Sequence, residues 1–76
     1  MNFIQEIEIN RRRAVLDILC KCPKGLRKRE ISSFIGIWVG DLVSVMAQME
    51  DEGIIERTPI RDMANMEFYD IWRLKN

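Results

Sequence analysis

The sequence predicts an α+β fold in which three helices precede a small antiparallel β-hairpin. Two short segments on either side of Gly36 repeat apolar residues at intervals of three and four, which is the period of an α-helix. After Gly53 the period changes, and two consecutive isoleucines open a stretch that alternates like a β-strand. In a chain of 76 residues these observations indicate a single domain, residues 1–76, with a thin hydrophobic core.

The first helix is predicted to begin at Ile9 or Asn10 and to end at Pro23. Asn10 is a suitable N-cap, because its side-chain oxygen can accept a hydrogen bond from a free backbone N–H. Pro23 stops the helix at the other end. The stripe predicted to be buried consists of Val15, Ile18, Leu19 and Cys22. With this start, Arg11–Arg13 fall in the first turn, where the helix dipole disfavours cations.

Residues 1–9 fit two patterns. Glu6 to Ile9 alternate like a strand, whereas Ile4, Ile7 and Arg11 share one helical face. A helical extension of the first helix is slightly favoured, and an N-terminal arm is the alternative. Exposed isoleucines on such an extension require a partner, and we expect it to be the same segment of a second subunit. A homodimer also suits a domain of this size.

The second and third helices flank a three-residue turn, Gly36–Trp38. The second helix begins near Lys28 and turns one face to the core, made of Ile31, Phe34 and Ile35. The third helix runs to about Glu52, and its buried positions are Leu42, Val45, Met46 and Met49. So short a turn does not allow two antiparallel helices, but it suits two helices that cross steeply. The sequence therefore predicts a helix-turn-helix.

The hairpin follows Gly53, which ends the third helix. Ile54–Thr58 reads as a strand, and Pro59 is expected to end its part in the hydrogen-bonded ladder, because proline has no N–H. Ile60–Asn65 is the predicted connection, and Met66–Leu74 is the returning strand. Large apolar residues stand on both faces of that strand, more than a solvent-exposed hairpin requires, so one face is predicted to meet a partner.

This arrangement resembles the winged helix-turn-helix superfamily over residues 11–74. Members of that family have a short first strand, a small residue inside the second helix, and a glycine and an apolar residue at the turn. Their third helix ends in acidic residues, a glycine and two apolar residues, and their last strand ends in an aromatic-x-leucine pair. The residues that match these features are Leu26, Ser32, Gly36, Ile37, the run Glu50–Ile55, Trp72 and Leu74. The resemblance implies a winged helix, in which the hairpin is the wing.

The resemblance also implies a function. It indicates a small transcriptional regulator of the bacterial, plasmid or phage type that binds duplex DNA as a homodimer. The third helix would lie in the major groove, with base contacts from Trp38, Val43, Ser44, Ala47 and Gln48. Phosphate contacts would come from the start of the second helix and from the wing, through Arg27, Lys28, Arg29, Arg57 and Arg61.

Charge is unevenly distributed along a chain whose net charge is zero. Residues 11–29 contain eight basic residues and one acidic residue, whereas residues 30–56 contain six acidic residues and no basic one. A basic patch can bind a polyanion, but the predicted DNA-reading helix carries no cation. The alternative is therefore a protein-binding winged helix, such as an anti-repressor or an assembly adaptor. Its binding surface would be Trp38, Val39 and Val43.

Several classes of function find no support in the sequence. The chain has no histidine, no glycine-rich phosphate loop and no nucleophile–base pair, so we expect neither an enzyme nor a cofactor. Two cysteines without histidine cannot build a zinc site, and no metal is expected. Cys20 is predicted to lie in the core and Cys22 to be less buried, in a reducing cytoplasm. No membrane span or export signal is recognisable, and no membrane partner is expected.

Overall fold

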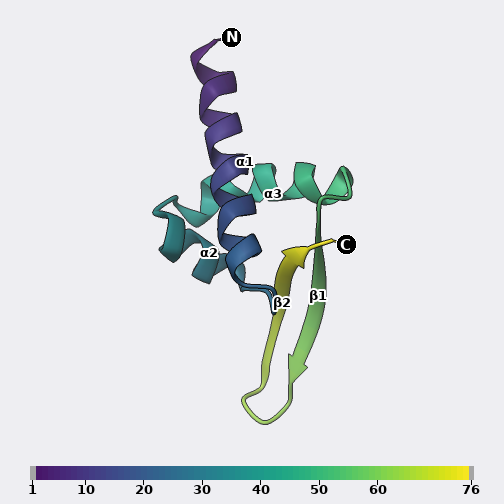
Figure 1. Cartoon of the computed structure of the whole chain (residues 1–76). Coiled ribbons are helices and arrows are strands. Elements are labelled where there is room, and N and C mark those ends of the chain that lie inside the picture. The colour runs from purple at the N-terminus through teal and green to yellow at the C-terminus, as the bar shows by residue number, and fades with distance from the viewer. Residues whose placement is uncertain (1, 76) are drawn as a thin grey trace.

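The computed structural model describes residues 2–75, in which three helices precede a two-stranded antiparallel hairpin (Figure 1). The elements are α1 (Phe3–Lys21), α2 (Lys28–Ile35), α3 (Val39–Asp51), β1 (Ile55–Asp62) and β2 (Glu67–Leu74). The predicted α+β class and the order of elements are confirmed. The hairpin and the first half of α1 extend from opposite ends of the helical body (Figure 1), and the longest dimension is 48 Å.

Within residues 2–75, no single helix is both long enough and apolar enough to cross a membrane.

α1 begins earlier than the predicted N-cap. The side chain of Asn2 accepts a hydrogen bond from the Gln5 N–H at 2.8 Å, and the Asn2 N–H donates to Gln5 Oε1 at 3.3 Å. This reciprocal pair caps the helix, so Asn10 is an interior residue and its predicted capping role is wrong. The helical extension is confirmed for residues 3–9, and Met1 lies outside the described residues. Arg11–Arg13 consequently lie in mid-helix, away from the unfavourable dipole of a first turn.

The turn between α2 and α3 is closed by hydrogen bonds at Ser32 and Gly36. Gly36 has φ 70°, a left-handed conformation that glycine adopts without the strain of a Cβ, and its N–H donates to the Ser32 carbonyl at 2.9 Å. The Ser32 hydroxyl donates to the carbonyl of Ile37 at 2.5 Å. The chain bends by 114° between the two helices, so they cross steeply, as predicted.

The hairpin is longer and more regular than predicted. β1 and β2 pair without a bulge, from Ile55 opposite Leu74 to Asp62 opposite Glu67. Leu26 forms an isolated antiparallel bridge with Trp72 on the free edge of β2, where the resemblance implied a short first strand. Both backbone groups of Trp72 take part, since its N–H donates to Leu26 at 2.8 Å and its carbonyl accepts at 2.9 Å.

Pro59 does not interrupt β1, contrary to the prediction. The N–H and the carbonyl of Trp72 both form hydrogen bonds with Leu26 and therefore point away from β1. Trp72 and Arg57, its partner across the hairpin, are consequently a pair without ladder hydrogen bonds. Pro59 is two residues further along β1 and therefore occupies the same kind of pair, opposite Asp70. An N–H at this position would point away from β2, so proline removes no hydrogen bond from the ladder.

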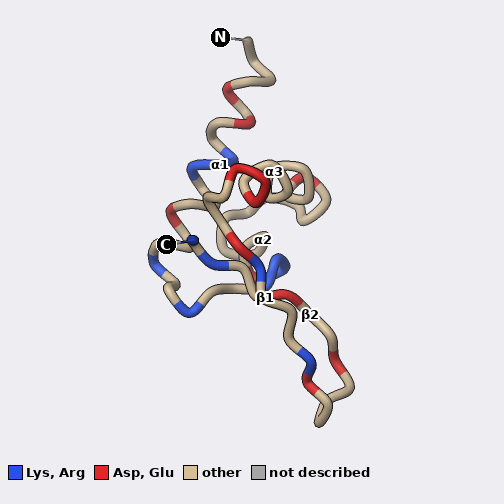
Figure 2. The backbone as a smooth tube through the Cα atoms, turned by 90° about the vertical axis from the view of Figure 1, so that its right-hand side faces the viewer, with Lys and Arg blue, Asp and Glu red and all other residues tan. Residues whose placement is uncertain are grey.

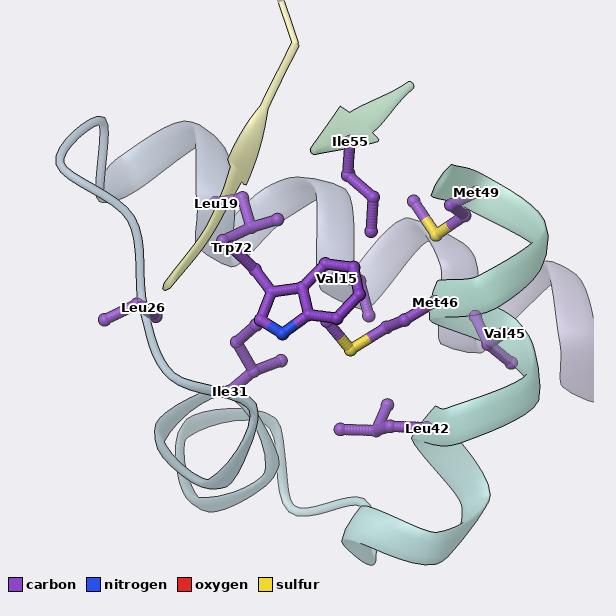
Figure 3. Packing of buried hydrophobic residues seen from close by; sticks show 10 residues of the cluster. All are labelled: Val15, Leu19, Leu26, Ile31, Leu42, Val45, Met46, Met49, Ile55 and Trp72. Carbon is purple, nitrogen blue, oxygen red and sulfur yellow. The ribbon is translucent and has the colours of Figure 1, made fainter. Parts of the chain in front are cut away.

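Trp72 lies at the centre of the hydrophobic core (Figure 3). Its indole comes from the hairpin and lies among side chains of all three helices. The buried apolar residues are Val15, Leu19, Leu26, Ile31, Leu42, Val45, Met46, Met49, Ile55 and Trp72. All four positions predicted for α3 are in this set, and Leu74 packs against it, as predicted for the closing aromatic-x-leucine pair.

Two residues predicted to lie in the core, Phe34 and Cys20, are exposed. Phe34 shares a helical face with Ile31 and Ile35, but it lies at the edge of that face and its side chain is 64% exposed. Cys20 is exposed, whereas Cys22 is half-buried against the core. The prediction that Cys20 is more buried than Cys22 was wrong, because Cys22 belongs to the predicted buried stripe with Val15 and Leu19 and Cys20 falls outside it.

Replacement of Gly25 by alanine is expected to destabilise the domain strongly. Gly25 has φ +91°, and a Cβ there would lie 2.5 Å from Ile71 Cγ2 and 2.7 Å from the Trp72 carbonyl oxygen. Strained backbone and overpacking together predict a loss of about 3 kcal/mol in the free energy of unfolding. The matched control is Gly53→Ala, where φ is +75° but the Cβ would meet nothing within 4 Å, and about 1 kcal/mol is expected. Equal losses in urea titrations of the two variants would contradict the predicted contact.

Candidate nucleic-acid interface

The side of α3 that faces away from the core carries the residues predicted to contact bases. Val43, Ser44, Ala47 and Gln48 are all exposed, because the 3.6-residue period places them opposite the buried row of α3. Trp38 precedes the helix and is 71% exposed. The five predicted base-contact residues therefore share one accessible region of the molecule, along α3 and at its start.

The outward face of α3 carries neutral polar and small apolar side chains. Ser44 and Gln48 carry the hydrogen-bonding groups that read base edges, and Val43 and Ala47 offer apolar contact to thymine methyl groups. Asp41 faces Arg11 of α1, with 3.5 Å between carboxylate and guanidinium, so part of its charge is compensated within the domain. Asp51, not singled out by the sequence reasoning, is exposed four residues after Ala47, on the same side of α3.

Trp38 owes its position to the absence of a side chain at Gly40. A Cβ on Gly40 would lie 2.2 Å from the nearest atom of the Trp38 ring. The indole therefore lies directly over the first turn of α3, with most of its surface in solvent. Together with Phe34, which is 64% exposed, and Val43, which is 51% exposed, it makes the α2–α3 region unusually apolar for a surface.

The predicted phosphate-contact residues of α2 differ in their surroundings. The Arg27 guanidinium lies 3.6 Å from the centre of the Tyr69 ring and 3.6 Å from the Glu67 carboxylate, so the hairpin holds it in place. The Lys28 ammonium lies 5.3 Å from the Trp72 ring. Arg29 is exposed and takes part in no ion pair within residues 2–75. Of the three cations, Arg29 is the most available to an external anion.

The two predicted phosphate-contact residues of the wing also differ. Arg57 lies 3.0 Å from Glu50 and 3.6 Å from Asp70, so two carboxylates already neutralise it. Arg61 is exposed, stands opposite Phe68 in the hairpin and lies 5.9 Å from its ring centre, with no carboxylate partner in the described part of the chain. Arg61 is therefore the wing cation most available to a phosphate.

An open hollow of about 380 Å³ joins the start of α2 to β2. It is lined by Arg27, Lys28, Arg29, Phe68, Tyr69, Asp70 and Trp72. Cations beside aromatic rings suit a sugar–phosphate backbone, which combines negative charge with apolar ribose surface. The sequence predicts the three cations as phosphate contacts and large apolar residues on both faces of the returning strand, but no local pattern links the two. They meet only because Leu26 pairs with Trp72.

The basic and acidic segments that are separate in the sequence are partly brought together in space (Figure 2). The basic start of α2 lies near the base of the hairpin, whereas the acidic end of α3 faces α1 through a paired contact between Arg12 and Glu52. One guanidinium nitrogen of Arg12 donates to Glu52 Oε1 at 3.0 Å, and a second donates to Oε2. These hydrogen bonds lower the pKa of Glu52 and raise that of Arg12, which keeps both groups ionised.

Comparison with known proteins adds no assignment. No protein-family model matches the chain, and no curated protein sequence matches it. Function is therefore inferred from the residues and their geometry alone.

The tip of the wing is held by Asp62 and Asn65. Asn65 donates to the Asp62 carboxylate twice, from its side-chain amide at 2.8 Å and from its backbone N–H at 3.2 Å. Met66 then takes a left-handed conformation, φ 54°, which returns the chain to β2. The hydrogen bonds from Asn65 lower the pKa of Asp62, because they stabilise the ionised carboxylate.

Replacement of Asn65 by alanine is expected to raise the pKa of Asp62 toward its ordinary value of 3.8. The hydrogen bond from the Asn65 side chain makes the largest contribution to the lowered pKa, and alanine removes it. A carboxyl pKa depressed by folding stabilises the wing above the unfolded pKa, and that stabilisation is lost as pH falls through the folded value. The measurement is an NMR titration of the Asp62 carboxyl carbon. Met63→Ala, which keeps both donors, is the control and should leave the pKa low; an unchanged pKa in Asn65→Ala would refute the assignment.

Proposed function

We propose that this chain is a small DNA-binding transcriptional regulator of the winged helix-turn-helix superfamily. The observation that carries the proposal is the 114° bend at Gly36, which leaves the outward face of α3 exposed. A helix presented in this way is the element that enters the major groove in helix-turn-helix proteins. On this proposal α3 reads bases through Ser44 and Gln48, and Val43 and Ala47 contact thymine methyl groups.

Affinity on this proposal comes from outside α3. Arg29 at the start of α2 and Arg61 on the wing are exposed cations without carboxylate partners in the described chain, and both are positioned to neutralise phosphates. Lys28 and Arg27 contribute at the edge of the hollow beside β2. Arg57 is expected to contribute little directly, because Glu50 and Asp70 already neutralise it.

Loss of Arg29 and Arg61 is expected to weaken DNA binding and to flatten its dependence on salt. Each phosphate contact adds about 0.9 to the slope of log affinity against log salt concentration, so Arg29→Ala with Arg61→Ala should reduce that slope by about 2. The measurement is fluorescence anisotropy on a mixed pool of labelled duplexes between about 50 and 200 mM salt.

Lys75→Ala is the matched control, because it removes an exposed cation that lies outside the interface. It should leave the slope nearly unchanged. If the unmodified protein shows no saturable, salt-dependent binding even at the lowest salt concentration, the isolated chain does not bind duplex DNA and the proposal fails.

Gln48→Ala is expected to relax sequence preference more than it lowers overall affinity. The amide of Gln48 can pair with adenine in the major groove, and one good pair of this kind contributes about 1–3 kcal/mol of discrimination. Binding sites are first selected from a random duplex pool with the unmodified protein. The ratio of affinity for these sites to affinity for random duplexes should be smaller for the variant than for the unmodified protein. Equal discrimination by both proteins would remove Gln48 from the base-reading face.

A second candidate function is protein binding through the same end of α3. The observation that favours it is the exposure of Trp38, at 71%, beside a helix without a basic residue. Exposed tryptophan among aliphatic side chains is typical of the energetic centre of a protein interface. On this reading the partner contacts Trp38 and Val43, and Val39, which is half-buried, supports them.

Two substitutions separate the protein-binding function from DNA binding. Trp38→Ala removes the indole, whereas Gly40→Ala keeps it but displaces it from α3, because the new Cβ would overlap the ring. Peptides selected on the unmodified protein from a displayed library should lose binding to both variants and keep binding to Arg29→Ala with Arg61→Ala. Selected peptides that bind Trp38→Ala unchanged would exclude this surface.

A further inference from the structure

The N-terminal half of α1 extends away from the rest of the domain (Figure 1). None of residues 3–9 is buried, although three of them carry large apolar side chains on one side of the helix. Phe3 is 75% exposed, Ile4 is 68% exposed, and Ile7 is the only half-buried residue in the segment. A capping box at Asn2 and Gln5 fixes this exposed segment as a helix, so its apolar side is presented without any cover from the domain.

The apolar side continues along α1 beside the helical body. Phe3, Ile7, Ala14 and Ile18 follow one another at spacings of four, seven and four residues, which keeps them in one row on the helix. At the far end of the row, Ala14 and Ile18 line an open hollow of about 310 Å³ between α1 and α2, whose apolar wall includes Phe34 and Ile35. α1 thus carries an apolar projection at one end and, at the other, a partly apolar hollow that Asp17 and Lys21 also line.

The charges along α1 indicate which partner covers its apolar side. Glu6 and Glu8 precede the row of basic residues Arg11–Arg13, so the helix is acidic in its first half and basic in its middle. Arg11 pairs with Asp41 of α3, and Arg12 pairs with Glu52, which follows α3. Glu6 and Arg13 are exposed and take part in no ion pair within residues 2–75. The surface is therefore complementary to itself when a second copy runs in the opposite direction.

We propose that the chain forms a twofold-symmetric dimer in which α1 packs antiparallel against α1 of a second copy. Glu6 and Arg13 are seven residues apart and stand on the same flank of the helix, and antiparallel pairing brings like flanks of the two copies together. Glu6 of each copy then meets Arg13 of the other. Parallel pairing would instead bring unlike flanks together and leave Glu6 of one copy and Arg13 of the other on opposite sides of the helix pair.

The register set by these ion pairs also places the apolar groups. Glu6 beside Arg13 of the second copy centres the pair between Ile9 and Asn10, since successive residues advance evenly along both helices. Phe3 and Ile4 then lie level with Ala14–Ile18 of the second copy, at the height of its hollow between α1 and α2. Each projection meets the hollow of the other copy, so the two apolar surfaces cover one another.

Asn10 fits the centre of this arrangement. It is exposed on α1, at the point where the apolar row is interrupted between Ile7 and Ala14. An asparagine amide has both a donor and an acceptor, so two copies related by a twofold axis can hydrogen-bond to each other. A polar residue at one position of an otherwise apolar helix pair is a recognised way to specify register. The dimer does not depend on whether the chain binds DNA.

Charge exchange tests the register. Sedimentation equilibrium over a concentration series should give a monomer–dimer equilibrium for the unmodified chain, and Glu6→Arg or Arg13→Glu alone should raise its dissociation constant on the order of tenfold, because two attractive contacts become repulsive. The double variant with both changes restores attraction and should recover the original dissociation constant within about twofold. Failure of the double variant to recover, with both singles weakened, would overturn the antiparallel register.

Apolar substitution tests the surface itself. Phe3→Ala with Ile4→Ala should weaken the dimer more than either charge change, whereas Ile9→Ala, on the other side of α1, should leave it unchanged. Circular dichroism on each variant verifies that α1 remains helical, since these side chains are exposed and contribute little to the fold. An unmodified chain that stays monomeric at the highest concentrations, or a dimer indifferent to Phe3 and Ile4, would overturn the proposal.

Discussion

The packing of Trp72 is the interaction on which the rest of the structure depends. Its indole fills the space between the three helices, so the hairpin closes a core that the helices alone would leave open. Its backbone N–H and carbonyl both pair with Leu26, which fixes the segment that leads into α2. Lys28 and Arg57 approach the same ring. One residue thus joins helix packing, sheet register and the placement of the cations beside the wing.

The α2–α3 turn determines which side of α3 is exposed to solvent. Ser32 closes the turn with a hydrogen bond from its hydroxyl, and Gly36 closes it with the left-handed conformation that glycine adopts without strain. The resulting bend directs the outward face of α3 into solvent. Gly40 leaves room for the indole of Trp38 over the first turn of α3. The same turn therefore presents the groups suited to base edges and the apolar side chains suited to a protein partner, which is why both proposed functions use the outward side of α3 and its start.

Internal ion pairs determine which charges remain for a partner. Carboxylates within the domain pair with Arg11, Arg12, Arg27 and Arg57. Among residues 2–75, cations without such partners remain at the start of α2, on the wing and on α1. One chain therefore offers few phosphate contacts, and a binding protein with few contacts gains little affinity from counterion release. Two copies joined through α1 would double the number of contacts on one DNA molecule. The proposed dimer and the proposed DNA binding are thus physically compatible, although each is tested separately.

The sequence by itself determined the helices, the turn and the hairpin, because apolar period, Gly36 and Gly53 act over a few neighbouring residues. The buried row of α3 was predicted completely, since a helical period leaves little choice of face. Only the tertiary structure decided how Pro59 fits into β1, because the pairing of Leu26 with Trp72 sets which N–H groups the ladder uses. It likewise decided that carboxylates from other elements hold Arg27 and Arg57, whereas none within residues 2–75 holds Arg29 or Arg61. Such contacts join residues far apart in the chain, and no local pattern records them.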